Sequence, residues 1–164
     1  SIHVGLALTK GQKMDYAIQK LVELGVTSFT PIITERCVVK LDEKRRESRQ
    51  EHWRSVIIAA CEQSGRCVIP ILNAGEPFHS WSASVSEHVR LILDPHADTS
   101  LNALEQPSSV ALAIGPEGGF TDDAVSSSKE HAFKAIRLGN RILRAETAPL
   151  ATVAALQALY GDFG

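Results

Sequence analysis

Val110-Ala111-Leu112-Ala113-Ile114, followed by Gly115-Pro116-Glu117-Gly118-Gly119-Phe120, is the stretch that decides the fold. The first five residues are apolar throughout, which is typical of a buried strand. The next six are too rich in Gly and Pro for regular structure, and such a loop lets a ligand approach the backbone closely. Because open α/β sheets bind ligands where their strands end, this loop is a candidate binding site. A tight turn between a strand and a helix is an equally open interpretation.

The same pattern, a strand that runs out into a loop, recurs in Leu138-Gly139-Asn140-Arg141-Ile142-Leu143-Arg144-Ala145-Glu146-Thr147-Ala148-Pro149. The charged residues Arg141, Arg144 and Glu146 lie there between a strand and an apolar helix, where a plain connector would not need them. A helix-capping ion pair with Glu146 at the helix start is the alternative. Two such loops in one small domain predict a single site with two walls.

Hydrophobic periodicity predicts the remaining elements. We expect strands at 2–8, 27–33, 68–72, 89–93, 110–114 and 135–138, and helices at 11–24, 42–63, 122–131 and 147–160. Residues 75–87 are poorly patterned. The helix at 147–160 is apolar almost all round, so it should be buried. Alternating strands and helices indicate an α/β fold with a mainly parallel sheet flanked by helices.

Composition narrows the class of protein. The chain has 164 residues, close to the roughly 150 of one domain. Its net charge of −2 argues against a broadly basic nucleic-acid coat, although a local basic patch remains possible. We find no membrane-spanning run and no signal peptide at the N-terminus. Three cysteines without a C-x-x-C pair predict a cytoplasmic setting, and we expect each to be a small buried residue.

Several common sites are missing from the sequence. There is no G-x-x-x-x-G-K-[ST] phosphate loop and no G-x-G-x-x-G fingerprint after the first strand, so ATP and NAD sites of the usual kinds are not expected. No G-x-S-x-G elbow is present. The six histidines lack metal-ligand spacing, so we expect no metal. The two glycine-containing loops are therefore the best candidates for chemistry.

The two loop motifs together resemble the SPOUT-class RNA methyltransferases, and among them the bacterial uridine-N3 methyltransferases of small-subunit ribosomal RNA. Further similar blocks are Lys10–Asp15, Gln19–Val26, Thr34–Arg36 and Glu62–Arg66. The resemblance implies a C-terminal trefoil knot, a homodimer and S-adenosyl-L-methionine as cofactor. It also implies an N-terminal RNA-binding β-barrel domain that this chain lacks, so we expect 1–164 to be a single catalytic domain.

Carried over by motif, the resemblance implies that the cofactor lies between the end of the 89–93 strand and the two loops. The implied contacts are Leu93, Ile114, Gly115, Gly118, Gly119, Leu138, Gly139, Ile142, Leu143, Arg144, Ala145 and Ala148. The implied reaction is methylation of N3 of a uridine in small-subunit ribosomal RNA. Arg144 is expected to stabilise negative charge on the uracil oxygens. Either Glu117 or Glu146 would orient the base or take the N3 proton, a choice that the sequence leaves open.

Five basic residues in the family-like blocks are expected to contact RNA: Lys10, Lys13, Lys20, Arg36 and Arg66. The basic residues between 40 and 54 alternate with acidic ones and are expected to form a solvated helix face instead. Two alternative functions remain. One is a 2′-O-ribose RNA methyltransferase of the same fold class. The other is a non-catalytic RNA-binding module, which would need neither loop motif.

Overall fold

A parallel sheet forms the centre of the molecule. The computed structural model describes residues 1–40 and 42–164. Within these residues the strand order is β3-β2-β1-β6-β5-β7, β4 pairs with β2, and all registered neighbours are parallel. The mainly parallel sheet predicted from the sequence is confirmed. The strands are β1 (Ile2–Ala7), β2 (Ser28–Ile33), β3 (Ile71–Leu72), β4 (Glu76–Pro77), β5 (Val89–Leu93), β6 (Val110–Ile114) and β7 (Phe133–Ile136).

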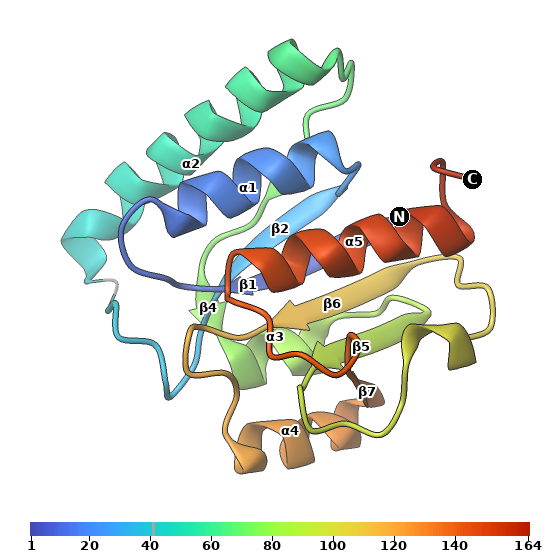
Figure 1. The fold of residues 1–164 in the computed structure, drawn as a ribbon. Helices are drawn as coiled ribbons and strands as arrows, with labels where there is room; N and C mark the ends of the chain where they lie inside the picture. The colour runs from blue at the N-terminus through green and yellow to red at the C-terminus, as the bar shows by residue number, and fades with distance from the viewer. Residues whose placement is uncertain (41) are drawn as a thin grey trace.

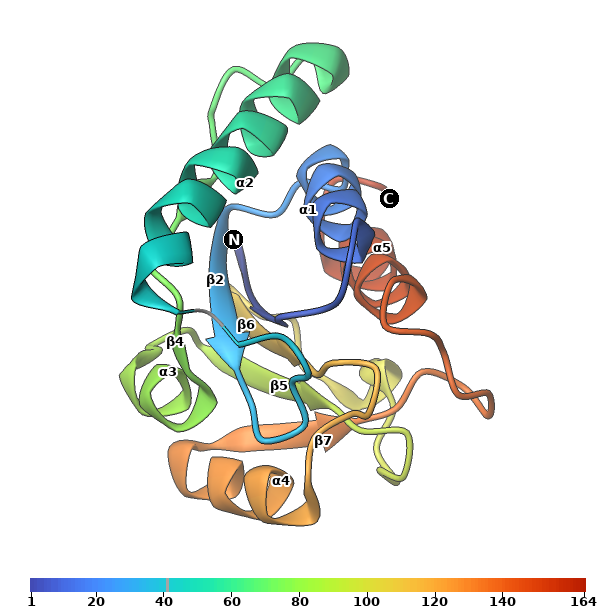
Figure 2. The same cartoon turned by 90° about the vertical axis from the view of Figure 1, so that its left-hand side faces the viewer.

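Helices cover both faces of this sheet. In the two views, α1, α2 and α5 lie over one face, and α3 and α4 lie over the other (Figures 1 and 2). The helices are α1 (Lys13–Glu23), α2 (Glu43–Ser64), α3 (Phe78–Ser84), α4 (Asp122–Ser128) and α5 (Thr147–Tyr160), with short 3₁₀ turns η1 (Leu101–Ala103) and η2 (Lys129–His131). The result is the three-layer arrangement of α/β proteins.

The central strand β6 contributes side chains to two hydrophobic cores, one on each face of the sheet. Successive side chains of a strand point to opposite faces of the sheet. Leu112 and Ile114 pack into the larger core under α1, α2 and α5, whereas Ala111 and Ala113 pack into the smaller core beneath α3 and α4. The smaller core holds Trp81, whose ring occupies the space that a side chain on Gly5 would fill. An all-apolar strand is therefore what a sheet covered on both faces requires.

Polar caps set the ends of two helices as the sequence suggests. The Asp42 carboxylate accepts the backbone N–H of Arg45 at 2.9 Å and begins α2. The Thr121 hydroxyl accepts the N–H of Ala124 at 3.1 Å and begins α4, directly after the Gly-rich loop. Such caps satisfy N–H groups that lack a partner within the helix.

Other boundaries differ from the sequence-based expectations. The expected strand 68–72 is reduced to Ile71–Leu72, and the last strand begins two residues before the expected Ala135. The poorly patterned stretch contains β4 and α3. The prediction that α5 is completely buried is wrong, because the Leu159 side chain on one face of the helix is 50% exposed. The prediction that each cysteine is buried is confirmed for Cys61 only, because Cys37 is half-buried and Cys67 is exposed.

Among the residues that the structure describes, no helix has the length and apolar character to cross a membrane. In the same residues, no group of three or more His, Cys, Asp or Glu side chains is arranged to hold a metal ion.

Candidate functional site

The loops that follow β5, β6 and β7 meet at the carboxyl-terminal edge of the sheet. We call residues 115–120 the glycine loop and residues 137–146 the arginine loop. Between them lies a cavity of about 510 Å³. It is lined by Lys13, Leu93, Pro95, His96, Ile114, Gly115, Pro116, Glu117, Gly118, Gly119, Ile142, Leu143, Arg144, Ala145, Glu146 and Ala148. Parallel strands place their C-terminal loops at one edge, which is why segments far apart in sequence converge here.

A smaller cavity of about 70 Å³ shares part of this wall. Leu93, Pro95, Ile142, Leu143 and Ala148 line both cavities, and the small one adds residues from the start of the arginine loop, including Leu138 and Gly139. Each of the twelve residues predicted to contact a cofactor lines one or both cavities. The structure therefore brings the whole predicted set together at one place.

The glycine loop owes its shape to two of its glycines. Gly119 has φ +70°, a left-handed conformation that disfavours other residues, and its N–H donates to Pro116 O at 2.8 Å. Gly115 lies so close to the loop's return that an added Cβ would stand 3.1 Å from the Gly119 carbonyl carbon and the Phe120 ring. The loop is thus a compact turn that exposes backbone to the cavity.

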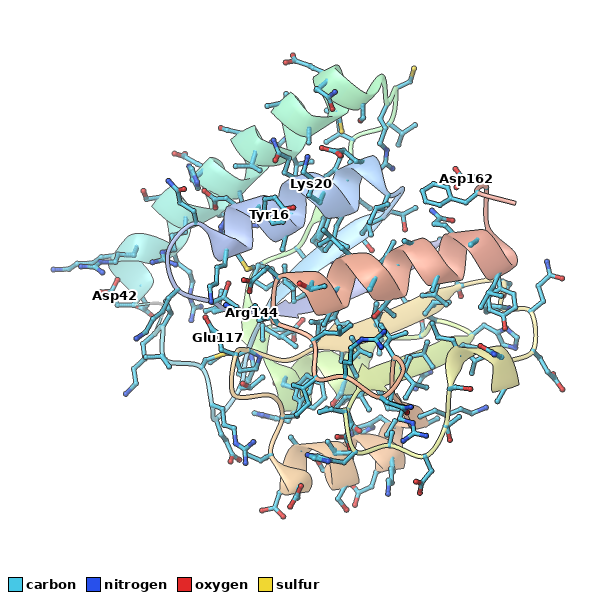
Figure 3. All side chains as sticks on the ribbon, viewed as in Figure 1. Tyr16, Lys20, Asp42, Glu117, Arg144 and Asp162 are labelled. Atoms are coloured by element: carbon cyan, nitrogen blue, oxygen red, sulfur yellow. The ribbon has the colours of Figure 1, made fainter. Side chains whose placement is uncertain are left out.

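The arginine loop joins the cavity to the start of α5. The Arg144 carbonyl accepts the N–H groups of Thr147 and Ala148 at 2.9 Å each, which closes the first turn of the helix. Arg141, Ile142 and Arg144 are exposed, and Figure 3 labels Arg144 near Glu117 at this edge of the sheet. Glu146 is the N-cap residue of α5, as the alternative interpretation places it, but its side chain makes no capping hydrogen bond there.

The Glu146 carboxylate instead takes part in a charged cluster with Lys13 and Glu117. Lys13 Nζ lies 3.8 Å from Glu117 Oε1 and 3.8 Å from Glu146 Oε2. Glu146 Oε2 is shielded from solvent and has no hydrogen-bond partner within the described part of the chain. Glu117 Oε1 also accepts the backbone N–H of Lys10 at 3.4 Å. One ammonium therefore stands between carboxylates from both loops.

The five residues predicted to contact RNA lie in different surroundings. Arg36 donates from Nη1 to the carbonyls of Gly118 and Phe120, and Arg66 donates from Nη1 to those of Val22 and Val26. Lys20 donates to Glu23 at 2.8 Å. This hydrogen bond raises the pKa of Lys20, and the negative charge of Glu23 adds to the rise. Lys13 belongs to the charged cluster.

Lys10 completes the set: the residue is exposed, and its backbone N–H lies beside the glycine loop, where it donates to Glu117. Lys10, Lys13 and Arg36 thus lie at the glycine loop, whereas Lys20 and Arg66 bond to other parts of the fold.

Sequence reasoning missed some of the lining residues. Pro95 and His96 follow β5 and line the cavity, although only the strand end at Leu93 was predicted. The Asp94-Pro95 pair was visible as the signal that ends the strand. Lys13 was predicted as an RNA contact, and its position on the cavity wall was not foreseen.

A second cavity of about 530 Å³ lies beside β1 and α3. Its polar groups bond to each other: His3 Nδ1 lies 2.8 Å from Glu87 Oε1, His3 Nε2 lies 2.8 Å from Thr30 Oγ1, and Asn73 Nδ2 donates to Thr30 Oγ1 at 3.0 Å. Paired groups of this kind stabilise the fold without calling for a ligand. The cavity between the two loops is therefore the better candidate site.

The chain is similar to known RNA methyltransferases. The family model for the RNA methyltransferase domain matches residues 1–157. The ribosomal RNA small subunit methyltransferase E of Buchnera aphidicola subsp. Schizaphis graminum is 37% identical over 163 residues, which cover 98% of this chain and 66% of that protein. The chain spans just under two thirds of the length of the first curated relatives that it matches, at 66% and 65%.

Two solved structures are similar over almost the whole chain. A ribosomal RNA small subunit methyltransferase E from Neisseria gonorrhoeae, bound to S-adenosyl methionine, has a TM-score of 0.94 and 38% identity and covers 100% of this chain and 68% of that one. A Legionella pneumophila protein in complex with the cofactor SAM has a TM-score of 0.95 and 41% identity, with coverages of 98% and 66%.

Proposed function

The chain belongs to the RNA methyltransferase domain family, and on that premise we propose that it methylates N3 of a uridine in small-subunit ribosomal RNA with S-adenosyl-L-methionine as methyl donor. The observation that carries the proposal is the convergence of the glycine and arginine loops on one cavity of about 510 Å³. The similar structures with bound cofactor support the choice of donor.

The residues at the cavity fit this cofactor in size and chemistry. The volume falls within the roughly 300–1,000 Å³ of small-molecule sites. Leu93, Ile114 and Leu143 offer apolar surface for an adenine ring, and the backbone of the glycine loop offers donors and acceptors for the polar parts. Glu117 and Glu146 supply negative charge beside a cationic ligand. We therefore assign the twelve predicted contacts to the cofactor.

The reaction moves one methyl group and one proton. Bound S-adenosyl-L-methionine supplies a methyl carbon on a positively charged sulfur. Uracil N3 loses its proton to a carboxylate of the protein, the N3–carbon bond forms as the sulfur–carbon bond breaks, and a neutral thioether remains. Glu117 or Glu146 accepts the proton or orients the base, and Arg144 donates hydrogen bonds to a uracil oxygen as charge develops there. The Arg144 side chain is exposed at the cavity, where a large substrate can reach it.

The test is methyl transfer from labelled S-adenosyl-L-methionine to small-subunit ribosomal RNA, followed by nucleoside analysis of the product. We expect label in N3-methyluridine. Label in a 2′-O-methyl nucleoside would replace the proposal by the ribose-methylation alternative. RNA binding without any transfer, and without cofactor binding, would favour the non-catalytic module.

We further propose that the C-terminal part of the chain is knotted, as the resemblance implies. The segment that follows β5 contacts both the end of β7 and the end of α5: Arg137 N donates to Thr99 O at 3.0 Å, and the Tyr160 hydroxyl donates to Leu101 O and Leu104 O. These contacts put the ends of β7 and α5 beside this segment, as a passage of the chain through it would require. The test is to join the two ends of the chain covalently and then denature the protein. We expect the denatured circle to be more compact than an unknotted circle of equal length.

A further inference from the structure

Arg36 is bound to the glycine loop through its guanidinium. Its Nη1 donates to Gly118 O at 2.8 Å and to Phe120 O at 3.3 Å. The aliphatic part of the side chain lies against the same loop, because a Cβ built on Gly118 would stand 3.4 Å from Arg36 Cδ. The two carbonyls flank Gly119, the residue with positive φ. Arg36 therefore holds the loop on both sides of its sharpest bend.

The backbone that carries Arg36 is itself fixed. It lies in a turn directly after β2, in which Cys37 N donates to Thr34 O at 3.1 Å and Thr34 N donates to Cys37 Sγ at 3.4 Å. Because β2 pairs with β1 inside the sheet, the turn has a rigid base. A long side chain that leaves such a base can fix the neighbouring glycine loop.

Lys13 reaches the glycine loop from a different element. It is the first residue of α1, and its ammonium lies 3.8 Å from a carboxylate oxygen of Glu117 and 3.8 Å from one of Glu146. Glu146 Oε2 lacks a hydrogen-bond partner among the residues described and is shielded from water, so the nearby ammonium offsets its charge. Glu117 belongs to one loop and Glu146 to the other. Lys13 thus links the two walls of the cavity.

We propose that Arg36 and Lys13 are positioning residues that set the shape of the cofactor cavity: Arg36 fixes the glycine loop, and Lys13 joins that loop to the arginine loop. The inference rests on the proposed function, since S-adenosyl-L-methionine is the ligand expected there. It revises the sequence-based expectation that both side chains contact RNA phosphates. The Nη1 group of Arg36 already serves two carbonyls, and the Lys13 ammonium already faces two carboxylates.

Arg36 is tested by calorimetric titration with S-adenosyl-L-methionine. We expect Arg36→Met to weaken cofactor binding about tenfold, because hydrogen bonds from a charged donor are among the stronger ones and the loop would lose two. Arg36→Lys, which keeps the charge but not the fork, should restore part of the affinity. Arg46→Met, an exposed position on α2, is the matched control and should bind like the parent. RNA binding by Arg36→Met should keep the parent's salt dependence.

Each other outcome has a definite meaning. Unchanged cofactor affinity in Arg36→Met overturns the positioning role. A salt slope lowered by about 0.7–0.9, the value of one phosphate contact, would return Arg36 to the RNA contacts. If the parent protein fails to bind the cofactor, the proposed function fails instead. If Arg36→Met does not fold, the comparison of Arg36→Lys with the parent decides, since equal affinity would contradict the proposal.

Lys13 is tested by a double-mutant cycle. We expect Lys13→Met to weaken cofactor binding severalfold and Lys13→Arg to restore it. In Glu146→Gln the ammonium has lost its partner in the arginine loop, so adding Lys13→Met should weaken cofactor binding less than it does in the parent. Strictly additive effects would show that Lys13 does not act through Glu146. A Lys13→Met variant with parental cofactor affinity and a reduced salt slope would make Lys13 an RNA contact.

Discussion

The backbone and the side chain of Arg144 have different roles, and a substitution can change one without the other. Its backbone carbonyl closes the first turn of α5, which any residue with the same conformation can do. Its side chain is exposed at the cavity between the loops. Lysine in its place therefore keeps the helix start and the positive charge and removes only the planar pair of donors.

We expect Arg144→Lys to bind the cofactor almost normally and to transfer the methyl group about 10²–10³-fold more slowly, the loss typical of a removed oxyanion donor. Single-turnover transfer, measured beside cofactor affinity on the same variant, checks this. Arg141→Lys, an exposed neighbour in the same loop, is the control and should retain most of the rate. If cofactor affinity falls in step with the rate, Arg144 is a cofactor ligand or a brace, and its role in transfer must be withdrawn.

At the residue scale, the sequence predicted which residues line the cavities better than it predicted the hydrogen bonds of the arginine side chains. The glycines and apolar residues of both loops could be predicted because their types and spacing mark where strands end. The hydrogen bonds of Arg36 and Arg66 could not be predicted, because a guanidinium donates to whichever acceptors the fold brings near it. For Arg36 one such acceptor is 82 residues away in sequence, and for Arg66 they are 40 and 44 away.

The glycine loop contains a residue with positive φ beside the cavity. Gly119 has φ +70°, and Gly65, which ends α2, has φ +73°; an added Cβ would meet no atom within 4 Å at either position. Alanine at either position should therefore lower the free energy of unfolding by a similar amount, about 1–2 kcal/mol, through backbone strain alone. Gly65 lies outside the residues that line the cavity.

We accordingly expect Gly119→Ala to weaken cofactor binding severalfold and Gly65→Ala to leave it unchanged, although both lose stability. Urea denaturation and calorimetric titration of the two variants measure the two effects separately. Equal cofactor affinities would mean that the glycine loop can change shape without consequence for the ligand.

Among the elements, the predictable ones carry strong local signals. The caps Asp42 and Thr121 and the i,i+4 spacing of Trp53, Ile57 and Cys61 in α2 are visible in the sequence. The helix α3 was missed because its seven residues include three serines, which favour helices weakly, and its two large apolar residues gain their helical setting from packing. Phe78 and Trp81 of that helix pack with Phe120 and Phe133 beneath the sheet, contacts that no local window contains.

For the whole molecule, alternation of strands and helices was enough to predict a parallel sheet, but not its strand order. That order places β1 between β2 and β6, so strands that are more than 100 residues apart become neighbours. Such pairing depends on which faces of the helices can be buried together, a property of the complete chain. The same argument applies to α5, whose composition suggested complete burial while one face stays uncovered within the chain.

The uncovered face of α5 predicts that two chains associate. The exposed Leu159, together with the half-buried Ala151 and Ala155 on the same side of the helix, gives α5 apolar surface that the sheet does not cover. A two-fold interface built on it would bury more than about 1,000 Å² in total. We expect light scattering at micromolar concentration to give the mass of two chains.

Leu159→Glu should shift that mass toward one chain, because a charge would be buried without a partner. Val68→Glu places the same charge at a 73% exposed apolar residue before β3 and should leave the dimer intact. A single-chain mass for the parent protein, or dissociation by both substitutions alike, would contradict a dimer through α5.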